Sequence, residues 1–480
     1  MNSTKARWLA LYVLCLGDLM IVLDTNIVNV ALPAIQGDLG FSPSALAWVL
    51  NAYMLTFGGF LLLGGRLGDL FGNRRVFLGA VVAFTAASAL CAAAPQAGAL
   101  VGGRGLQGVA GAFVSAVALA LITALFDDAA ERAKAMAFYG FVMSGGGAVG
   151  VLLGGVLTGF LTWHWVFLVN VPIGLAVGVL GARVLPKDRR PAARTRLDVP
   201  GAVLVTSALV LVVYAVVGGS EHGWASGRTL GVLASGAVLL AAFVGWEARA
   251  THPLMPLRMF RIRSLVVAQV VGILWSGAMF ATFYLASLYL QQVLRYSAVE
   301  VGLAFLPTCV AMAYVSLRWS GGIVMRYGPR APMTAGLTLV AVGLGLLALA
   351  PVDGHYATDV LPAMVLSGLG AGLALSPVLL VAMSEVPPEE AGLASGLANT
   401  SFSLGGALGL AVLVSVATSH TEALAAGGTD PVAALDGGFQ WGFAGGAGFA
   451  LLAAVVGFVF LRPARAAAGA DEATEELVAA

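Results

Sequence analysis

Residues 98–126 read GALVGGRGLQGVAGAFVSAVALALITALF, an apolar stretch whose only charged residue is Arg104. A stretch of this length can cross the hydrocarbon core of a bilayer as a helix, which needs about 20 residues. An arginine inside such a helix is energetically costly, so it faces the protein interior and has a partner there. Its clearest partners are Asp18 and Asp24, both within the first apolar stretch of the chain. A buried arginine with a buried aspartate indicates a protein that moves a charge or a solute across a bilayer.

The composition also indicates a membrane protein. Of the 480 residues, 59% are hydrophobic and 10% charged, and the mean hydropathy is +0.93, which leaves too little charged surface for a soluble protein of this size. The net charge of +1 argues against a nucleic-acid partner. Cys15, Cys91 and Cys309 lie in apolar stretches, where cysteine acts as a small packing residue. No phosphate-binding Gly-Lys-Ser/Thr loop is present, so ATP is not the expected energy source. We expect no catalytic, cofactor or metal site.

Apolar stretches recur along the whole chain and predict fourteen membrane-spanning helices. They lie at roughly 8–32, 46–66, 76–95, 98–124, 135–158, 163–184, 199–218, 229–247, 265–290, 299–322, 331–350, 358–384, 397–418 and 440–461. An even number of spans places both ends of the chain on one side of the membrane.

The loops on that side contain most of the basic residues, and those on the other side only Arg228 and Arg295. The first group comprises Lys5, Arg7, Arg66, Arg74, Arg75, Arg132, Lys134, the cluster 183–196, Arg249, Arg258, Arg261, Arg263, Arg326, Arg330, Arg462 and Arg465. Cytoplasmic loops are enriched in lysine and arginine, so both termini are predicted to be cytoplasmic. The heavy use of alanine, glycine and arginine fits a GC-rich bacterial genome, and we expect an all-α protein of the bacterial inner membrane.

Two loops of the chain resemble each other: GRLGDLFGNRR at 65–75 and GGIVMRYGPR at 321–330. Each is a short, basic, glycine-containing connection between two spans, and the separation leaves room for two extra helices. The simplest architecture is two six-helix bundles related by a two-fold axis along the membrane normal. We expect the first bundle at 1–196, two inserted helices at 197–262, and the second bundle with a short cytoplasmic tail at 263–480.

Five motifs in this order resemble the major facilitator superfamily, and specifically its fourteen-span drug:proton antiporters. Besides the loop at 65–75, these are LDTNIVNVALP (23–33), GRGLQG (103–108), WHWVFLVNVPIG (163–174) and YLQQVLRYSAVEVGLAFLP (289–307). The resemblance covers nearly all of the chain to about residue 462. It implies the major facilitator fold and proton-coupled export of lipophilic drugs or antibiotics by alternating access.

Two alternatives stay open at this point. One is proton-coupled or facilitative transport of another metabolite or a lipid on the same fold, since fold alone does not fix function. It is favoured by Val151, which stands where the antiporter motif of the group has a proline. The other is a membrane sensor that does not transport, although a sensor should have a signalling domain and only 462–480 follow the last span.

The predicted proton-coupling residues are Asp24, Asp18 and Arg104. On one helix, two residues six positions apart differ by about 120° in direction and about 9 Å in height, so the two carboxylates cannot point at the same place. Apolar surroundings favour the neutral form of a carboxyl group and a nearby arginine favours the charged form, and a proton-coupled switch needs this competition. We expect Asp18, near the bilayer midplane, to match Arg104 in height better than Asp24. The structural alternatives are an aspartate that stabilises a helix bend and an arginine that binds backbone carbonyls.

The loop at 65–75 is the predicted cytoplasmic gate, with Gly65, Asp69, Gly72, Arg74 and Arg75 as its residues. Asp69 would pair with a basic group or a helix N-terminus across the bundle interface in one state and separate in the other. Anchoring by the positive-inside rule explains Arg74 and Arg75 equally well, but not Asp69. The second loop has Met325 at the position of Asp69, so only the first half keeps this acid.

The predicted substrate-binding residues combine polar and aromatic side chains of the spans. They are Asn26, Asn29, Asn51, Tyr53, Gln107, Phe141, Phe283, Tyr284, Gln291 and Asn399. Such a lining suits a lipophilic, amphipathic small molecule better than a sugar, which requires many fixed hydrogen bonds. The expected partners are this substrate, protons and the lipid bilayer. The sequence leaves the oligomeric state open, with a monomer as the working expectation.

Overall fold

The computed structural model describes residues 4–126, 128–188, 198–250, 253, 257–386 and 391–461, and every regular element in these residues is helical. The helices are α1 (Thr4–Leu39), α2 (Pro43–Leu46), α3 (Trp48–Phe71), α4 (Asn73–Ala92), α5 (Ala97–Leu125), α6 (Ala129–Phe160), α7 (Trp165–Leu168), α8 (Asn170–Val184), α9 (Val199–His222), α10 (Gly227–Glu247), η1 (Leu257–Arg261), α11 (Arg263–Leu288), η2 (Tyr289–Val293), α12 (Ala298–Val315), η3 (Ser316–Ser320), α13 (Gly321–Tyr327), α14 (Arg330–Leu347), η4 (Tyr356–Val360), α15 (Leu361–Met383), α16 (Ala391–Ala426) and α17 (Pro431–Phe460).

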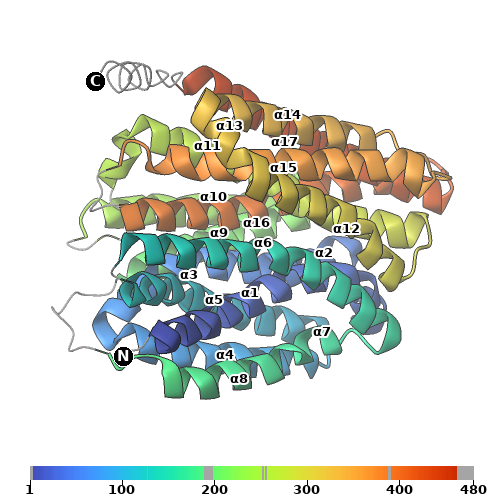
Figure 1. Cartoon of the computed structure of the whole chain (residues 1–480). Helices are drawn as coiled ribbons and strands as arrows, with labels where there is room; N and C mark the ends of the chain where they lie inside the picture. The colour runs from blue at the N-terminus through green and yellow to red at the C-terminus, as the bar shows by residue number, and fades with distance from the viewer. Residues whose placement is uncertain are drawn as a thin grey trace, which may run out of the picture.

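The long helices run side by side along one common direction (Figure 1). Helices α1 to α8 are stacked on one side of the molecule and α11 to α17 on the other. Helices α9 and α10 pack against each other, and α9 also contacts both α3 and α16. Helix α9 therefore contacts both sides of the stack.

The expected membrane spans correspond to helices of the structure. Within the described residues, 13 helices are long and apolar enough to cross a membrane by length and composition. A shorter apolar segment, Val149–Phe160, is the second half of α6, which is 32 residues long in total. Each of the fourteen predicted stretches coincides with one of these segments, so the prediction of an all-α integral membrane protein is confirmed.

Helix α1 is longer than the sequence predicted. It has 36 residues and continues through Pro33 to Leu39, where Gly40 leaves the helix with a φ of +67°. The expected end was at residue 32. Asp24 therefore lies about 22 Å before the end of its helix instead of about 12 Å, because an α-helix rises about 1.5 Å per residue. This shift places Asp24 deeper in the protein than expected.

The glycines of α6 allow it to pack closely on two helices at once. A Cβ atom on Gly154 would lie 2.5 Å from the carbonyl oxygen of Ile27 in α1, and one on Gly155 would lie 2.6 Å from that of Ala298 in α12. Val151 is 1% exposed in the same segment. Without the expected proline, α6 continues unbroken through this position, and its glycines explain the close contact between the first and second halves of the chain.

The two halves also meet where α1 ends, which we call the Leu39 end of the molecule. Three hydrogen bonds cross it: Ser287 to the carbonyl of Asn29 (2.8 Å), Gln291 to the carbonyl of Val30 (3.2 Å) and Gln292 to the side chain of Gln36 (3.2 Å). All of these groups are uncharged. They hold α1 against α11 and η2, so the Leu39 end is closed between these helices.

Candidate functional site

Helix α5 carries Arg104 and Gln107 on one buried face that also contains glycines. Arg104, Gln107, Gly108 and Gly111 are spaced three or four residues apart and are all buried. A Cβ atom on Gly108 would lie 2.1 Å from the hydroxyl of Thr56 in α3, so only glycine lets the two helices approach this closely. The packing of α5 on α3 brings Arg104 into the interior.

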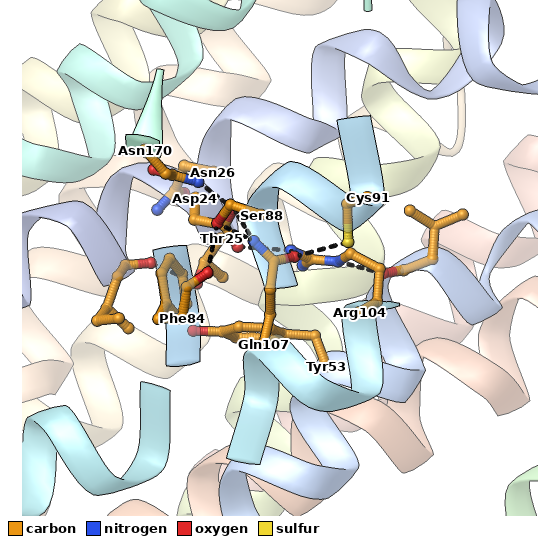
Figure 2. Close-up of polar contacts among 12 residues, drawn as sticks. Asp24, Thr25, Asn26, Tyr53, Phe84, Ser88, Cys91, Arg104, Gln107 and Asn170 are labelled. Carbon is orange, nitrogen blue, oxygen red and sulfur yellow. Dashed lines mark hydrogen bonds and ion pairs between the residues drawn. The ribbon is translucent and has the colours of Figure 1, made fainter. Parts of the chain in front are cut away.

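Arg104 pairs with Asp24 at the centre of a buried polar network (Figure 2). Its Nη1 lies 2.5 Å from Oδ2 of Asp24, and both side chains are 0% exposed. The other carboxylate oxygen, Oδ1, accepts from Nε2 of Gln107 at 3.0 Å and from Nδ2 of Asn170 at 2.8 Å. A buried ion pair is stable only when further hydrogen bonds satisfy its remaining polar atoms, and Asp24 has three donors.

The remaining contacts of Arg104 come from α3 and α7. Its Nε donates to the carbonyl of Val49 at 2.9 Å. The guanidinium carbon lies 4.4 Å from the ring centre of Tyr53 and 5.7 Å from that of Phe167. An arginine over an aromatic ring gains a favourable cation–π interaction, which is stronger away from water. Three other helices, α1, α3 and α7, thus fix the position of this one side chain, together with Gln107 of its own helix.

Two residues of α4 extend the network through Gln107. The amide of Gln107 donates to the hydroxyl of Ser88 at 2.8 Å, and its oxygen accepts from the thiol of Cys91 at 3.3 Å. Sequence reasoning missed Ser88 and Asn170. Asn170 had a signal, because it is the polar residue in the apolar part of the motif at 163–174. Ser88 had none, since serine is common in packed membrane helices.

The expectation that Asp18 would be the partner of Arg104 is wrong. Asp24 takes this position because α1 extends to Leu39, which places Asp24 and not Asp18 at the level of Arg104. Asp18 is 0% exposed and accepts from the hydroxyl of Ser115 at 2.5 Å, while its Oδ2 has no hydrogen bond within the described residues. Tyr139 of α6 lies close enough to interact electrostatically with it. In the described part of the chain, no ion pair involves Asp18.

Some predicted substrate residues lie in or beside this network. Tyr53 and Gln107 belong to it. Asn51 is fully buried on α3, and neither atom of its amide has a hydrogen-bond partner among the described residues. Asn26 and Asn29 donate to backbone carbonyls of their own helix, at 2.8 and 3.3 Å.

The other predicted substrate residues lie elsewhere. Phe283 stacks on Phe305 with ring centres 5.2 Å apart, and Gln291 contributes to the closure at the Leu39 end. Tyr284 is 1% exposed, whereas Asn399 is exposed. The side chain of Phe141 lies outside the described residues. The structure therefore does not gather the predicted set into one pocket.

The predicted gate loop is held by a residue that the sequence did not single out, Asp188. Its carboxylate accepts from the backbone N–H groups of Arg74 at 2.8 Å and Arg75 at 3.2 Å, so it caps the start of α4. The side chain of Arg74 donates to the carbonyl of Ala182 at 2.6 Å. Gly72 has a φ of +94°, and a Cβ atom there would lie 2.2 Å from the carboxyl carbon of Asp188. Glycine is therefore required at this turn.

The acidic part of the predicted gate is not described. Gly65 has open space around its Cβ position, and the side chain of Asp69 lies outside the described residues, as do residues 189–197 of the basic linker. The pairing of Asp69 across the bundle interface stays a prediction. The contacts of Arg74 and Arg75 tie their loop to the segment that follows α8.

Long apolar helices packed around a buried ion pair define a class of multi-pass membrane transporter. Residues 14–410 match the Major Facilitator Superfamily, and the chain belongs to this family. It is 42% identical to the puromycin resistance protein pur8 of Streptomyces alboniger, over 95% of this chain and 91% of the relative. It is 40% identical to the cephamycin export protein CmcT of Amycolatopsis lactamdurans, over 88% of this chain and 87% of the relative.

Solved structures support the fold at low sequence identity. The chain is similar to the peptide transporter PepTSo of the POT family, with a TM-score of 0.69 and 18% identity, covering 96% of this chain and 98% of the other. It is also similar to the xylose transporter XylE from E. coli, with a TM-score of 0.62 and 16% identity, covering 96% and 99%. These likenesses confirm the predicted transporter fold.

Proposed function

We propose that this protein is a proton-coupled exporter that moves lipophilic organic molecules, antibiotics among them, out of a bacterial cell by alternating access. Support comes from relatives named for puromycin resistance and cephamycin export, each matched over most of its length. Val151 stands where the antiporter motif has a proline, but α6 still packs closely on α1 and α12 through its glycines, so the valine does not argue against export.

The observation that carries proton coupling is the contrast between two carboxylates on α1. Asp24 is paired with Arg104 and also accepts hydrogen bonds from Gln107 and Asn170. Asp18 is fully buried, has the neutral hydroxyl groups of Ser115 and Tyr139 as polar neighbours, and forms no ion pair among the described residues. An unpaired carboxylate in an apolar interior is strongly disfavoured as an ion. We therefore assign the proton of this conformation to Asp18, from which a proton moves on to Asp24 in the next step of the cycle.

In this scheme, a proton that reaches Asp24 neutralises the partner of Arg104. The guanidinium would then lose its ion pair while keeping Val49 and Gln107 as neutral partners. A buried arginine without a counter-charge is unfavourable, so α1 and α5 would rearrange. Movement of α1 away from α11 would open the Leu39 end, and Arg104 would be the group through which protonation drives this change.

The test uses everted membrane vesicles acidified by respiration, with a fluorescent probe of the internal pH and puromycin as the first substrate. Addition of puromycin to vesicles with the wild-type protein should release protons from the interior. Asp18→Asn should abolish this release at equal expression. Asp38→Asn on the same helix is the matched control, because an asparagine oxygen still accepts from Trp163, which donates to Asp38 at 2.8 Å.

Each result has a defined reading. Proton release by Asp18→Asn at the wild-type rate would contradict the assignment of the proton to this residue. Puromycin movement down its gradient without any proton movement would favour the facilitative alternative. Proton release by wild type and Asp38→Asn alone would support the proposal.

We further propose the architecture and setting that the sequence predicted. The bundles would be 1–196 and 263–480, joined by the inserted helices of 197–262, with both termini cytoplasmic and the Leu39 end outside. The working unit would be a monomer in the inner membrane. The loop at 65–75 would be the cytoplasmic gate. Cysteine labelling from either side of intact cells, at Ser42 for the outside and at Lys187 for the inside, would test the orientation.

A further inference from the structure

A cavity lies at the Leu39 end, away from the polar network. Its volume is about 110 Å³, and its walls come from α1, α2, α11, η2, α16 and α17. This is somewhat smaller than a cavity of about 150 Å³ that binds benzene in another protein. Because the cavity is open to solvent on the side of Glu422, it can hold the ammonium end and part of the hydrocarbon of a small organic molecule, but not a whole antibiotic.

The polar groups of this cavity favour a cation. Glu422 lines it and is exposed, so its carboxylate marks the side that is open to solvent. Tyr284 also lines it, and its buried hydroxyl has no hydrogen-bond partner among the described residues. Gln36 and Gln292 contribute amide groups. The lining residues include no lysine or arginine, so the one charged group that an anion would meet there is the carboxylate of Glu422.

The remaining walls are apolar, with Leu46, Leu285, Leu288 and Phe439 among them. An aromatic ring next to a carboxylate is a favourable setting for an organic ammonium group, because both attract positive charge. Apolar walls exclude a strongly hydrated metal ion and favour a hydrocarbon substituent. The chemistry of the cavity therefore matches a primary aralkyl ammonium ion.

The cavity exists only while the two halves of the chain are in contact. Gln36 and Leu46 belong to the first half, whereas Tyr284, Gln292 and Glu422 belong to the second. The hydrogen bond from Gln292 to Gln36 closes one side of it. Separation of α1 from α11 would break this bond and pull the walls apart. A molecule in the cavity therefore binds the closed conformation of the Leu39 end more tightly than an open one, and so shifts the equilibrium toward the closed conformation.

We propose that this cavity is a second ligand site, which binds an organic ammonium group and holds the Leu39 end closed. The site is distinct from the network around Asp24 and Arg104. Glu422 attracts the charge, Tyr284 accepts a hydrogen bond from the ammonium group, and Phe439 packs on the hydrocarbon part. The inference rests on the proposed function only in taking the Leu39 end as one that opens during transport.

The test measures binding of benzylammonium chloride to the purified full-length protein in lipid nanodiscs by saturation-transfer NMR. Benzyl alcohol serves as the uncharged comparison. Glu422→Gln should weaken benzylammonium binding roughly fivefold, the range expected for an ion pair with one exposed member, and should leave benzyl alcohol unchanged. Tyr284→Phe should weaken the ammonium in the same way. Asp353→Asn, an exposed acid outside the cavity lining, is the matched control and should have no effect.

A second measurement reports the closure itself. In Gln36→Cys/Gln292→Cys protein, benzylammonium should increase the yield of cross-linking by a short bifunctional thiol reagent. The same pair combined with Glu422→Gln should show no increase. The three native cysteines are buried and do not compete.

The proposal is overturned if Glu422→Gln binds benzylammonium as tightly as wild type, or if binding leaves the cross-linking yield unchanged. Failure of the proposed function is a separate result. Benzylammonium should bind the Asp18→Asn protein normally even though that variant does not transport. Normal transport by Asp18→Asn would overturn the proton assignment and leave this cavity unaffected.

Discussion

The coupling between Arg104 and Asp24 can be measured by a double-mutant cycle. Removal of one member of a buried ion pair typically costs about 3–5 kcal/mol, because the other charge is left uncompensated. Asp24 would keep Gln107 and Asn170 in Arg104→Gln, and Arg104 would keep Val49 and the Tyr53 ring in Asp24→Asn. We therefore expect the lower end, about 3 kcal/mol for each single variant.

The double variant Asp24→Asn/Arg104→Gln should be no less stable than either single one, since it buries no charge at this site. The two single effects would then exceed the double effect by about 3 kcal/mol, the upper part of the range for residues in contact. Unfolding in mixed micelles can be followed by labelling of Cys91. Its thiol is 0% exposed and hydrogen-bonded to Gln107, so it reacts with the label only when the protein unfolds. Cys15→Ala and Cys309→Ala make the label specific.

The matched control is the partly exposed pair of Arg7 and Glu131, whose charged atoms lie 3.1 Å apart with side chains 28% and 32% exposed. Its cycle should give at most about 1 kcal/mol, because solvent screens such pairs. Additive effects of Asp24→Asn and Arg104→Gln would refute the reasoning. So would a coupling no larger than that of the control pair.

Three further results are expected. Asp69→Asn should reduce puromycin resistance strongly in a growth assay, whereas Met325→Asp should not, because Met325 is 90% exposed. Equal effects of the two variants would count against a role for an acid that is specific to the first loop. Asp188→Ala should lower the free energy of unfolding by about 0.5–2 kcal/mol through loss of the α4 cap, and an unchanged unfolding curve would show that the cap is dispensable. Gly155→Ala should impair folding or transport, because its Cβ would lie 2.6 Å from a carbonyl oxygen of α12. Gly79→Ala is the control, since the space around its Cβ position is open. Similar transport by both variants in vesicles would exclude a tight α6–α12 contact.

The fold was predictable because membrane spans leave a strong signal in the sequence. Twenty apolar residues in a row allow little besides a helix in lipid, and repeated motifs indicated the family. The ends of helices were less predictable. Pro33 sits inside α1, where proline usually favours an end, and tertiary contacts carry the helix on to Leu39.

The site was predictable only in part. Arg104 and the aspartates stood out because charges are rare in apolar stretches. The choice between Asp18 and Asp24 depended on helix length, and the contribution of Asp188 depended on how the linker folds back onto α4. The dispersed substrate residues show a further limit, since residue type alone does not say which face of a helix meets a neighbour.

The three hydrogen bonds that close the Leu39 end have a consequence for the environments in which the protein can work. Each joins uncharged groups, and bonds of this kind contribute about 0.5–1.5 kcal/mol each, so together they can bias two conformations by a few kcal/mol. Dissolved salt weakens attraction between exposed ions but has little effect on neutral amides and hydroxyls. The contribution of these three bonds to the balance between closed and open forms should therefore be nearly the same at low and at high salt, whatever the medium outside the cell.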